Sequence, residues 1–318
     1  MASSNNIKTI KFKLIDNPTF RIRYEFTPEY KAPTIISETA ILPLPTTLIG
    51  TILAVFIDLG KISLQGINED IVISDNTLKF KAYEKLIERA LGPETKIYGP
   101  YLEYENEKFI GFSERTLNDR IIKVKHLNQS VNPDTIKQIA TQVQTEVVTG
   151  IDIDPKTKTV KIGYTYYMER VILKNWSICI DLIDSKNKID ALEGKIVKLG
   201  TKGAKAIIEI DYNGENSLYF CAEKRMCKCN NMAYLLISPA ILPQSKKSWK
   251  LACGSILLTA IGYSYIQNAK RPIMPLLSTG SIVKSASSHT LFFDDRYSKY
   301  GFGSMYPIFF NTKYPSNC

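Results

Sequence analysis

The sequence has few of the side chains that most enzymes use for proton transfer. Among 318 residues there are only two histidines, His126 and His289, and neither lies in a recognisable catalytic group. Histidine commonly acts as general acid or base near neutral pH, so a metal-independent ribonuclease remains an alternative to a non-catalytic protein. Asp152, Asp154 and Asp294-Asp295 would need carboxylates from other elements to hold a metal ion. We interpret them as turn and surface residues.

Cysteine is also scarce, and its six copies are scattered. In a chain of this length the scatter is typical of a reducing compartment and argues against a disulfide framework. Cys221, Cys227 and Cys229 form the tightest group. Structural zinc usually takes four ligands arranged as two close pairs, whereas only Cys227-x-Cys229 is close here and no histidine lies nearby. We expect loop thiols, with zinc as the alternative, and predict no metal site and no cofactor.

Long apolar runs are absent. The longest, Leu48–Leu59 and Met232–Leu242, fall short of the roughly 20 residues that a membrane-spanning helix needs. Met1–Asn6 contains no basic region leading into an apolar one, as a secretory signal would. We therefore expect a cytoplasmic protein that does not engage a membrane.

Positive charge is in excess. Lys and Arg number 41 against 31 Asp and Glu, for a formal net charge of +10. Such an excess favours an acidic partner such as nucleic acid, although a basic protein without one is the plain alternative. Hydrophobic residues at 44% and charged residues at 23% are ordinary for a globular protein, and the length allows two domains.

Hydrophobic periodicity predicts more strands than helices. Helices are expected at about 46–59, 81–91, near 186–192, and in a short segment opened by Asn132-Pro133. Strands are expected at 8–14, 20–26, 96–104, 108–112, 120–126, 146–153, 159–166, 176–183, 206–212, 232–237, 255–266 and 280–286. This pattern predicts an α+β chain with two antiparallel sheets, each with helices on one face. Two ferredoxin-like (RRM-like) domains, residues 1–150 and 151–318, would suit it.

The segment Lys198–Lys205 is the strongest candidate for binding an anion. It contains Gly200 and Gly203, carries lysines without an acid, and leads into an alternating strand. Glycine permits positive φ, which brings backbone N–H groups close to a partner, and such N–H groups form a concave anion site. Lys202, Gly203 and Lys205 are therefore candidate RNA-binding residues, with a plain connecting turn as the alternative.

The helix expected from Thr46 or Thr47 to Leu59 has no acid in its first turn. No acidic side chain therefore offsets the positive N-terminal end of the helix dipole. Thr46, Thr47 and Gly50 form a candidate phosphate-binding site there. Glycine inside a helix is less stable than alanine by roughly 1 kcal/mol. The close approach of another backbone would explain why a glycine is present at this position. The alternative is that the helix packs through Gly50 against a strand.

Aromatic and basic residues alternate between residues 109 and 125. Single-stranded RNA is held by basic grooves with aromatic stacking, so this hairpin region could form a thumb that touches RNA. The residues in question are Phe109, Phe112, Arg115, Arg120, Lys123 and Lys125. The alternative is a solvated hairpin, because Glu107, Glu114 and Asp119 offset part of the charge. Residues 297–314 are also rich in aromatics, which favours either an interface or a last core strand.

Several motifs, in order along the chain, resemble the RAMP proteins of CRISPR systems. They are Pro43–Gly50, Gly150–Asp154 followed by Lys158-Thr159 and Tyr164–Glu169, the glycine-rich Leu199–Lys205, Arg271-Pro272 with Ser278–Val283, and Gly301–Ser304. The set covers most of residues 40 to 304. Within the superfamily it is most similar to subunit three of type III-B (Cmr) effector complexes, and next to subunit four of type III-A (Csm) complexes.

The resemblance implies a non-catalytic subunit with two ferredoxin-like domains that caps the 5′ end of the guide RNA and holds its repeat-derived handle. Its expected protein partners are the large cyclase-bearing subunit and the first RAMP backbone subunit. The later motifs add candidate RNA-binding residues at Gly280, Ser281, Lys284, Gly301 and Gly303. A RAMP endoribonuclease that processes repeat RNA is the alternative within the same fold.

Overall fold

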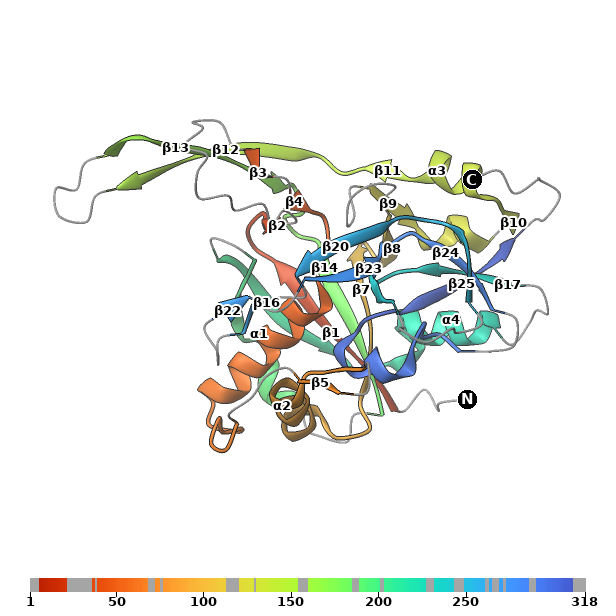
Figure 1. Cartoon of the computed structure of the whole chain (residues 1–318), viewed down its shortest axis with the longest axis horizontal. Coiled ribbons are helices and arrows are strands. Elements are labelled where there is room, and N and C mark those ends of the chain that lie inside the picture. The colour runs from red at the N-terminus through yellow and green to blue at the C-terminus, as the bar shows by residue number, and fades with distance from the viewer. Residues whose placement is uncertain are drawn as a thin grey trace.

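The structure is a computed structural model. It describes residues 6–21, 36–37, 39–67, 72–74, 77–112, 120–128, 130–153, 160–184, 189–200, 203–226, 232–242, 249–260, 263–264, 269–270, 273–285 and 290–310. Figure 1 shows a body built around two large sheets, from which a two-stranded arm projects. None of the described helices is long and apolar enough to cross a membrane.

The largest sheet has eight strands in the order β11-β9-β8-β7-β14-β1-β16-β15, and all of its pairs are antiparallel. Its strands are β1 (Ile7–Leu14), β7 (Lys96–Tyr104), β8 (Glu107–Phe112), β9 (Arg120–Lys123), β11 (Thr141–Gln142), β14 (Ser177–Ile183), β15 (Ile196–Leu199) and β16 (Ala204–Asp211). The first strand of the chain thus pairs with β14 and β16. Because the sheet takes strands from both sides of residue 150, a division into domains at that position stays a prediction.

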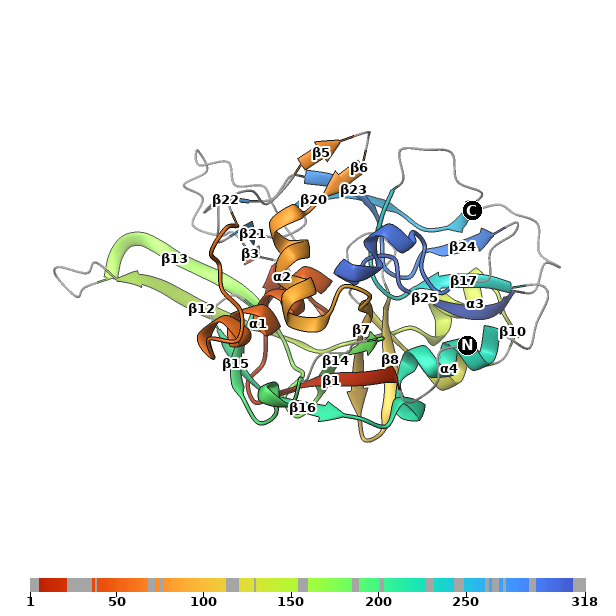
Figure 2. The ribbon, with the colours of Figure 1, turned by 90° about the horizontal axis from the view of Figure 1, so that it is seen from below.

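Helices α1 (Pro45–Asp58) and α2 (Lys81–Leu91) cover one face of this sheet (Figure 2). Alternate residues of β1, such as Ile10, Phe12 and Leu14, point into the core beneath the helices. Helix α2 has the predicted bounds, because its buried residues recur at helical spacing and Gly92 follows its last turn. The first core therefore lies between the sheet and these two helices.

Helix α1 begins earlier than expected. Leu44 occupies the N-cap position without a side-chain hydrogen bond, and Pro45 is the first helical residue. Proline suits that position because its φ is already helical and the N–H it lacks would have no partner inside the helix. The expectation that Thr46 or Thr47 caps the helix is therefore wrong, since both lie within the first turn.

A five-stranded sheet, ordered β10-β25-β17-β24-β19, packs over part of the other face of the large sheet. It contains β10 (Ser130–Val131), β17 (Met232–Leu236), β19 (Trp249–Cys253), β24 (Ile282–Ser285) and β25 (Met305–Phe310), with β10 and β25 parallel. A second core, which includes Tyr98, Tyr101 and Tyr234, fills the space between the sheets. Helix α3 (Pro133–Ile139) begins at the predicted cap, where the Asn132 side chain accepts a hydrogen bond from the Thr135 N–H. Helix α4 (Leu218–Met226) was not expected from the sequence.

The arm in Figure 1 is the hairpin of β12 (Thr145–Ile153) and β13 (Val160–Val171). The described strands of the region expected to form a thumb, β8 and β9, lie instead within the eight-stranded sheet. The remaining short strands are β2 (Phe20–Arg21), β3 (Ile36–Ser37), β4 (Thr39–Ala40), β5 (Val72–Ser74), β6 (Thr77–Lys79), β18 (Ala240–Ile241), β20 (Ile256–Ala260), β21 (Tyr263–Ser264), β22 (Ala269–Lys270) and β23 (Ile273–Leu277).

Short 3₁₀ helices replace two expected elements. The strand expected over 120–126 ends at Lys123, where η2 (Val124–Asn128) begins, and the helix expected near 186–192 is described only as η3 (Asp190–Leu192). Two more are η4 (Gly214–Asn216) and η5 (Asp295–Tyr300). The chain is thus a mixed fold with large antiparallel sheets and few helices, as predicted at that level.

Candidate nucleic-acid interface

The glycine-rich segment is a hairpin that joins β15 to β16. Leu199 pairs with Ala204, and Gly200 and Gly203 have the positive φ values of 72° and 64° that were expected of them. Thr201 and Lys202 lie outside the described residues. A Cβ on Gly200 would lie 2.4 Å from the Thr19 carbonyl oxygen, whereas one on Gly203 would meet only the flexible Lys198 side chain. Gly200 therefore has a packing role, whereas Gly203 lies against the Lys198 side chain.

Lys198 and Lys205 face each other across this hairpin. Both are exposed, while their neighbours Val197, Leu199 and Ala204 are buried against the core. Like charges directly opposite one another on a sheet are destabilising, so the pair is a local electrostatic cost to the isolated chain. An anion placed between the two ammonium groups would remove that cost. The sequence analysis placed Lys198 in the anion-binding segment but selected only Lys202 and Lys205 as RNA-binding lysines. The alternation of Lys198 with the apolar Val197 and Leu199 could have added it.

The backbone of Lys205 is held firmly. Its N–H donates to the Asp16 carboxylate at 3.1 Å, and its carbonyl accepts from the Ile15 and Asp16 N–H groups. On the same outer face, Lys13 lies 3.3 Å from Glu209. The Lys205 side chain therefore extends from a backbone held by hydrogen bonds. Its neighbour Lys13 has its charge offset by Glu209.

The start of α1 is less accessible than expected. Thr46 is buried, and its carbonyl accepts a hydrogen bond of 2.9 Å from the Tyr83 hydroxyl. Thr47 and Gly50 are partly exposed, and nothing lies within 4 Å of a Cβ built on Gly50. The alternative that the helix packs through Gly50 against a strand is therefore wrong. Helix α1 packs against β15, but on the sheet face that holds Val197 and Leu199, so the lysine pair lies on the opposite face of this edge strand.

Gly301 and Gly303 are buried, and contacts within the chain explain both. A Cβ on Gly301 would lie 2.8 Å from the Pro45 Cβ, and one on Gly303 would lie 2.9 Å from the Phe293 Cβ. Their φ values are 73° and 74°, a region where residues with side chains are strained. This loop therefore packs the end of the chain onto α1 and offers no surface for RNA.

The motif at 278–284 is mostly internal as well. Gly280 and Ser281 are buried, the Gly280 N–H donates to the Leu236 carbonyl, and the Ser281 and Ser278 hydroxyls lie 3.0 Å apart. Lys284 differs, because it is partly exposed and faces exposed Lys250 across β24 and β19. The two sheets thus each carry a cross-strand lysine pair near an edge, and Figures 1 and 2 place β24 well away from β15 and β16.

Of the aromatic residues expected to stack on RNA, Phe112 is only 5% exposed and packs in the second core, so its ring is not available. Phe109 is partly exposed and joins a cluster that the sequence did not indicate. Trp176 stacks on Tyr104 at 4.8 Å and lies 5.1 Å from Phe109, and the Lys123 ammonium group sits 5.8 Å from the Phe109 ring. Arg120 is partly exposed at the other end of β9. Arg115 lies outside the described residues.

The aromatic residues near the C-terminus favour the alternative of core packing. Tyr297, Tyr300, Phe302 and Tyr306 are all buried. Phe309 is partly exposed. Tyr314 lies outside the described residues.

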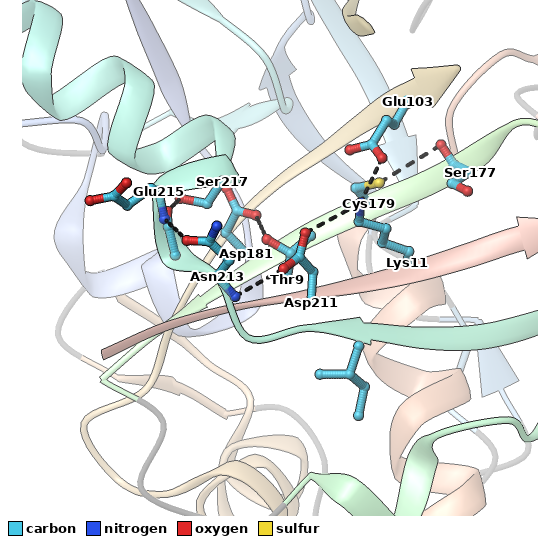
Figure 3. A network of polar contacts seen from close by, with 12 residues as sticks. Thr9, Lys11, Glu103, Ser177, Cys179, Asp181, Asp211, Asn213, Glu215 and Ser217 are labelled. Carbon is cyan, nitrogen blue, oxygen red and sulfur yellow. Dashed lines mark hydrogen bonds and ion pairs between the residues drawn. The ribbon is translucent and has the colours of Figure 1, made fainter. Parts of the chain in front are cut away.

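A buried polar network connects the sheet to α4 (Figure 3). Asp181 on β14 is fully buried and accepts hydrogen bonds from the Thr9 hydroxyl at 2.7 Å, the Tyr101 hydroxyl at 2.9 Å and the Tyr219 N–H at 2.8 Å. Burial raises the pKa of Asp181 to about 6, against the effect of these three hydrogen bonds. A raised pKa often marks a functional site, but this carboxylate is enclosed and satisfied, so it serves the attachment of α4.

Among the described residues, the candidates for catalysis and metal binding do not converge. His126 is exposed on η2, and His289 lies outside the described residues. Within the described ranges, no group of three or more His, Cys, Asp or Glu side chains is arranged to hold a metal ion. Cys221 lies on α4, while Cys227 and Cys229 fall outside the described part of the chain.

Comparison with known proteins gives a consistent relationship. No family model matches the sequence. The CRISPR system Cmr subunit Cmr3 of Saccharolobus solfataricus is 26% identical over 143 residues, which are 42% of this chain and 42% of that protein. The match thus spans less than half of the relative's length.

Solved structures extend the likeness to most of the fold. A chain of the type III-B Cmr-beta complex bound to cognate target RNA and AMPPnP has a TM-score of 0.62 at 18% identity, covering 87% of this chain and 86% of that one. A second, from the complex bound to cognate target RNA, has the same score and identity and covers 93% and 96%. The resemblance to Cmr3 proteins predicted from the sequence motifs is therefore confirmed.

Proposed function

We propose that this chain is a non-catalytic, RNA-binding subunit of a type III-B CRISPR effector complex. In this role it caps the 5′ end of the guide RNA and holds the repeat-derived handle. The observation that carries the proposal is the exposed pair of Lys198 and Lys205, opposite one another beside Gly203. The two ammonium groups repel each other in the isolated chain, which lowers its stability. An RNA phosphate would attract both groups, and the release of counterions from the RNA would favour binding further.

The chain would contact RNA around β15, the edge strand of the large sheet, where α1 lies on one face and the lysine pair on the other. Gly50 leaves open space on the exposed side of α1, which lets a sugar-phosphate backbone approach the helix. At the hairpin, Gly203 lies against the Lys198 side chain, and Lys202, between the glycines, would add a third cation. Phosphate contacts of this kind position RNA without reading its sequence.

Two protein partners complete the role, the large cyclase-bearing subunit and the first RAMP backbone subunit. Leu251 on β19 and Ile256 on β20 are 48% and 57% exposed, and we propose that they contribute to one of these contacts. We propose further that the two large sheets belong to two ferredoxin-like domains. No feature of the described residues favours the alternative, a RAMP endoribonuclease.

A cleavage and assembly experiment tests this function. Purified protein is incubated with labelled repeat RNA without divalent metal, and binding without a discrete cut is expected. The chain is also co-expressed with the large subunit, treated with nuclease and passed over a gel-filtration column, where the two proteins should co-elute. Specific cleavage would favour the endoribonuclease, and two separate peaks would contradict a direct contact between the subunits.

A further inference from the structure

A pocket of about 480 Å³ lies where the tip of the β7–β8 hairpin meets η2, α4 and β25. It is distant from the lysine pair, because five strand spacings separate β8 from β15 in the large sheet, or about 24 Å. Its size is within the usual range for small-molecule sites. Lys108, Lys125, Lys224 and Arg225 line it, with the side chains of Asn128 and Phe309.

Positive charge dominates this pocket. Four cationic side chains and one carboxylate, Glu107, line it. Glu107 is shared, since its Oε1 atom lies 3.0 Å from the Lys123 ammonium group and 2.8 Å from that of Lys125. These contacts lower the pKa of Glu107, so it remains ionised, but one carboxylate does not balance the cations. The pocket is therefore suited to an anion.

The cations and rings at the pocket are held in fixed positions. The Arg225 guanidinium lies 4.5 Å from the Phe309 ring and 5.8 Å from the Tyr306 ring, and it donates hydrogen bonds to the Leu127 carbonyl and the Asn128 side chain. The Lys224 ammonium group lies 4.2 Å from the Phe220 ring. A site ordered before its ligand arrives loses less entropy on binding.

We propose that this pocket binds a nucleotide, either free or as one residue of an RNA strand. Lys108, Lys125 and Lys224 would hold the phosphate, since ammonium groups make strong, charge-assisted hydrogen bonds to phosphate oxygens. The Phe309 ring, which is partly exposed and carries Arg225 over one face, offers a planar surface on which a base stacks, and the Asn106 and Asn128 amides can pair with a base edge. The proposal concerns a second site and does not rest on the role in a CRISPR complex.

Cys221 lines the pocket and provides a local reporter. The rate at which iodoacetamide alkylates Cys221 is measured in the full chain by peptide mass spectrometry. The probes are inorganic phosphate, uridine 5′-monophosphate and a five-residue oligouridylate. Cys253 on β19 does not line the pocket and serves as an internal reference. We expect the nucleotide to slow alkylation of Cys221 at least threefold, to act at lower concentration than phosphate, and to leave Cys253 unchanged.

A double variant, Lys108→Ala with Lys224→Ala, should raise the nucleotide concentration for half-protection about tenfold. Lys81→Ala with Lys85→Ala, at exposed positions on α2, is a matched control and should leave it unchanged. Lys205→Ala should also leave it unchanged, which separates this site from the proposed RNA-capping surface. Melting curves check that each variant is folded.

Stronger protection by the oligouridylate than by the mononucleotide would support the site and identify RNA as its source. Equal protection would support it and identify a free nucleotide. Absence of protection at millimolar concentration would overturn the proposal, as would unchanged protection in the double variant. A pentaglutamate peptide that protects as well as the oligouridylate would also overturn it, because the surface would then suit an acidic protein.

Discussion

The Asp181 carboxylate accepts a hydrogen bond of 2.8 Å from the backbone N–H of Tyr219, and so joins β14 to the first turn of α4. Ser217 supplies a second cap, since its hydroxyl accepts from the Phe220 N–H at 3.1 Å. The far end of α4 carries Lys224 and Arg225. A buried acid on the sheet thus helps to fix the helix that presents the cations of the pocket.

The stability of the protein should depend on pH through this acid. The pKa of Asp181 is about 6 in the folded protein against 3.8 for an ordinary aspartate. Between these two pH values the folded state therefore binds more protons than the unfolded state. Protonation of Asp181 thus stabilises the folded protein at low pH, and this stabilisation is lost as pH rises from about 4 to 6. Two pKa units correspond to about 3 kcal/mol.

Asp181→Asn removes this titration while retaining groups that can pair with Thr9, Tyr101 and Tyr219. The free energy of unfolding of the variant relative to the unaltered protein should therefore rise by about 3 kcal/mol between pH 4 and pH 7. Urea unfolding at several pH values measures it. A difference that is constant across this range would show that Asp181 does not titrate as described.

Gly50→Ala should stabilise the isolated chain. Nothing lies within 4 Å of the added Cβ, and alanine is favoured over glycine in a helix by about 1 kcal/mol. The same change should weaken RNA binding, because the methyl group occupies the space proposed for a sugar-phosphate backbone. Ala54→Gly, at an exposed site on the same helix, is the control and should destabilise the chain without affecting RNA binding. Unaltered RNA affinity in Gly50→Ala would remove this helix from the interface.

Gly301→Ala should act in the opposite way. The added Cβ would lie 2.8 Å from the Pro45 Cβ, at a φ of 73°, so we expect a loss of about 1–3 kcal/mol in the free energy of unfolding. RNA affinity of the folded protein should not change, because this loop is buried. Thermal melting and RNA titration separate the two effects. A stable variant with weakened RNA binding would return Gly301 to the interface.

Local patterns allowed good predictions for some elements. Helix α2 and the Asn132 cap follow from spacing and capping within a few residues, and β1 follows from alternation. In contrast, β15 is four residues long and α4 only nine, too short to give a clear period. The pairing of β1 with both β14 and β16 joins distant parts of the sequence, and no local pattern specifies such a partner.

The site could be predicted less well than the fold. A glycine motif indicates a position with positive φ or close packing, but it does not show which residue or ligand lies against the glycine. A Cβ on Gly203 would meet only the flexible Lys198 side chain, whereas Gly301 and Gly303 pack against Pro45 and Phe293. Similarly, alternation places Phe112 on one face of β8, but only the second sheet determines that this face is buried.

The central claim, that Lys198 and Lys205 hold guide RNA, is tested most directly by the salt dependence of binding. Fluorescence anisotropy with a handle-bearing guide RNA is measured over a range of salt for Lys198→Ala with Lys205→Ala. Lys81→Ala with Lys85→Ala, at exposed positions on α2, is a control of equal charge. We expect the slope of log affinity against log salt to become shallower by about 1.4, or about 0.7 for each lost phosphate contact.

The melting temperature of the Lys198/Lys205 variant should stay the same or rise slightly, because the repulsion between the two lysines is removed. The control should keep the slope of the unaltered protein. A Lys198/Lys205 variant that retains the original slope and affinity would contradict the account.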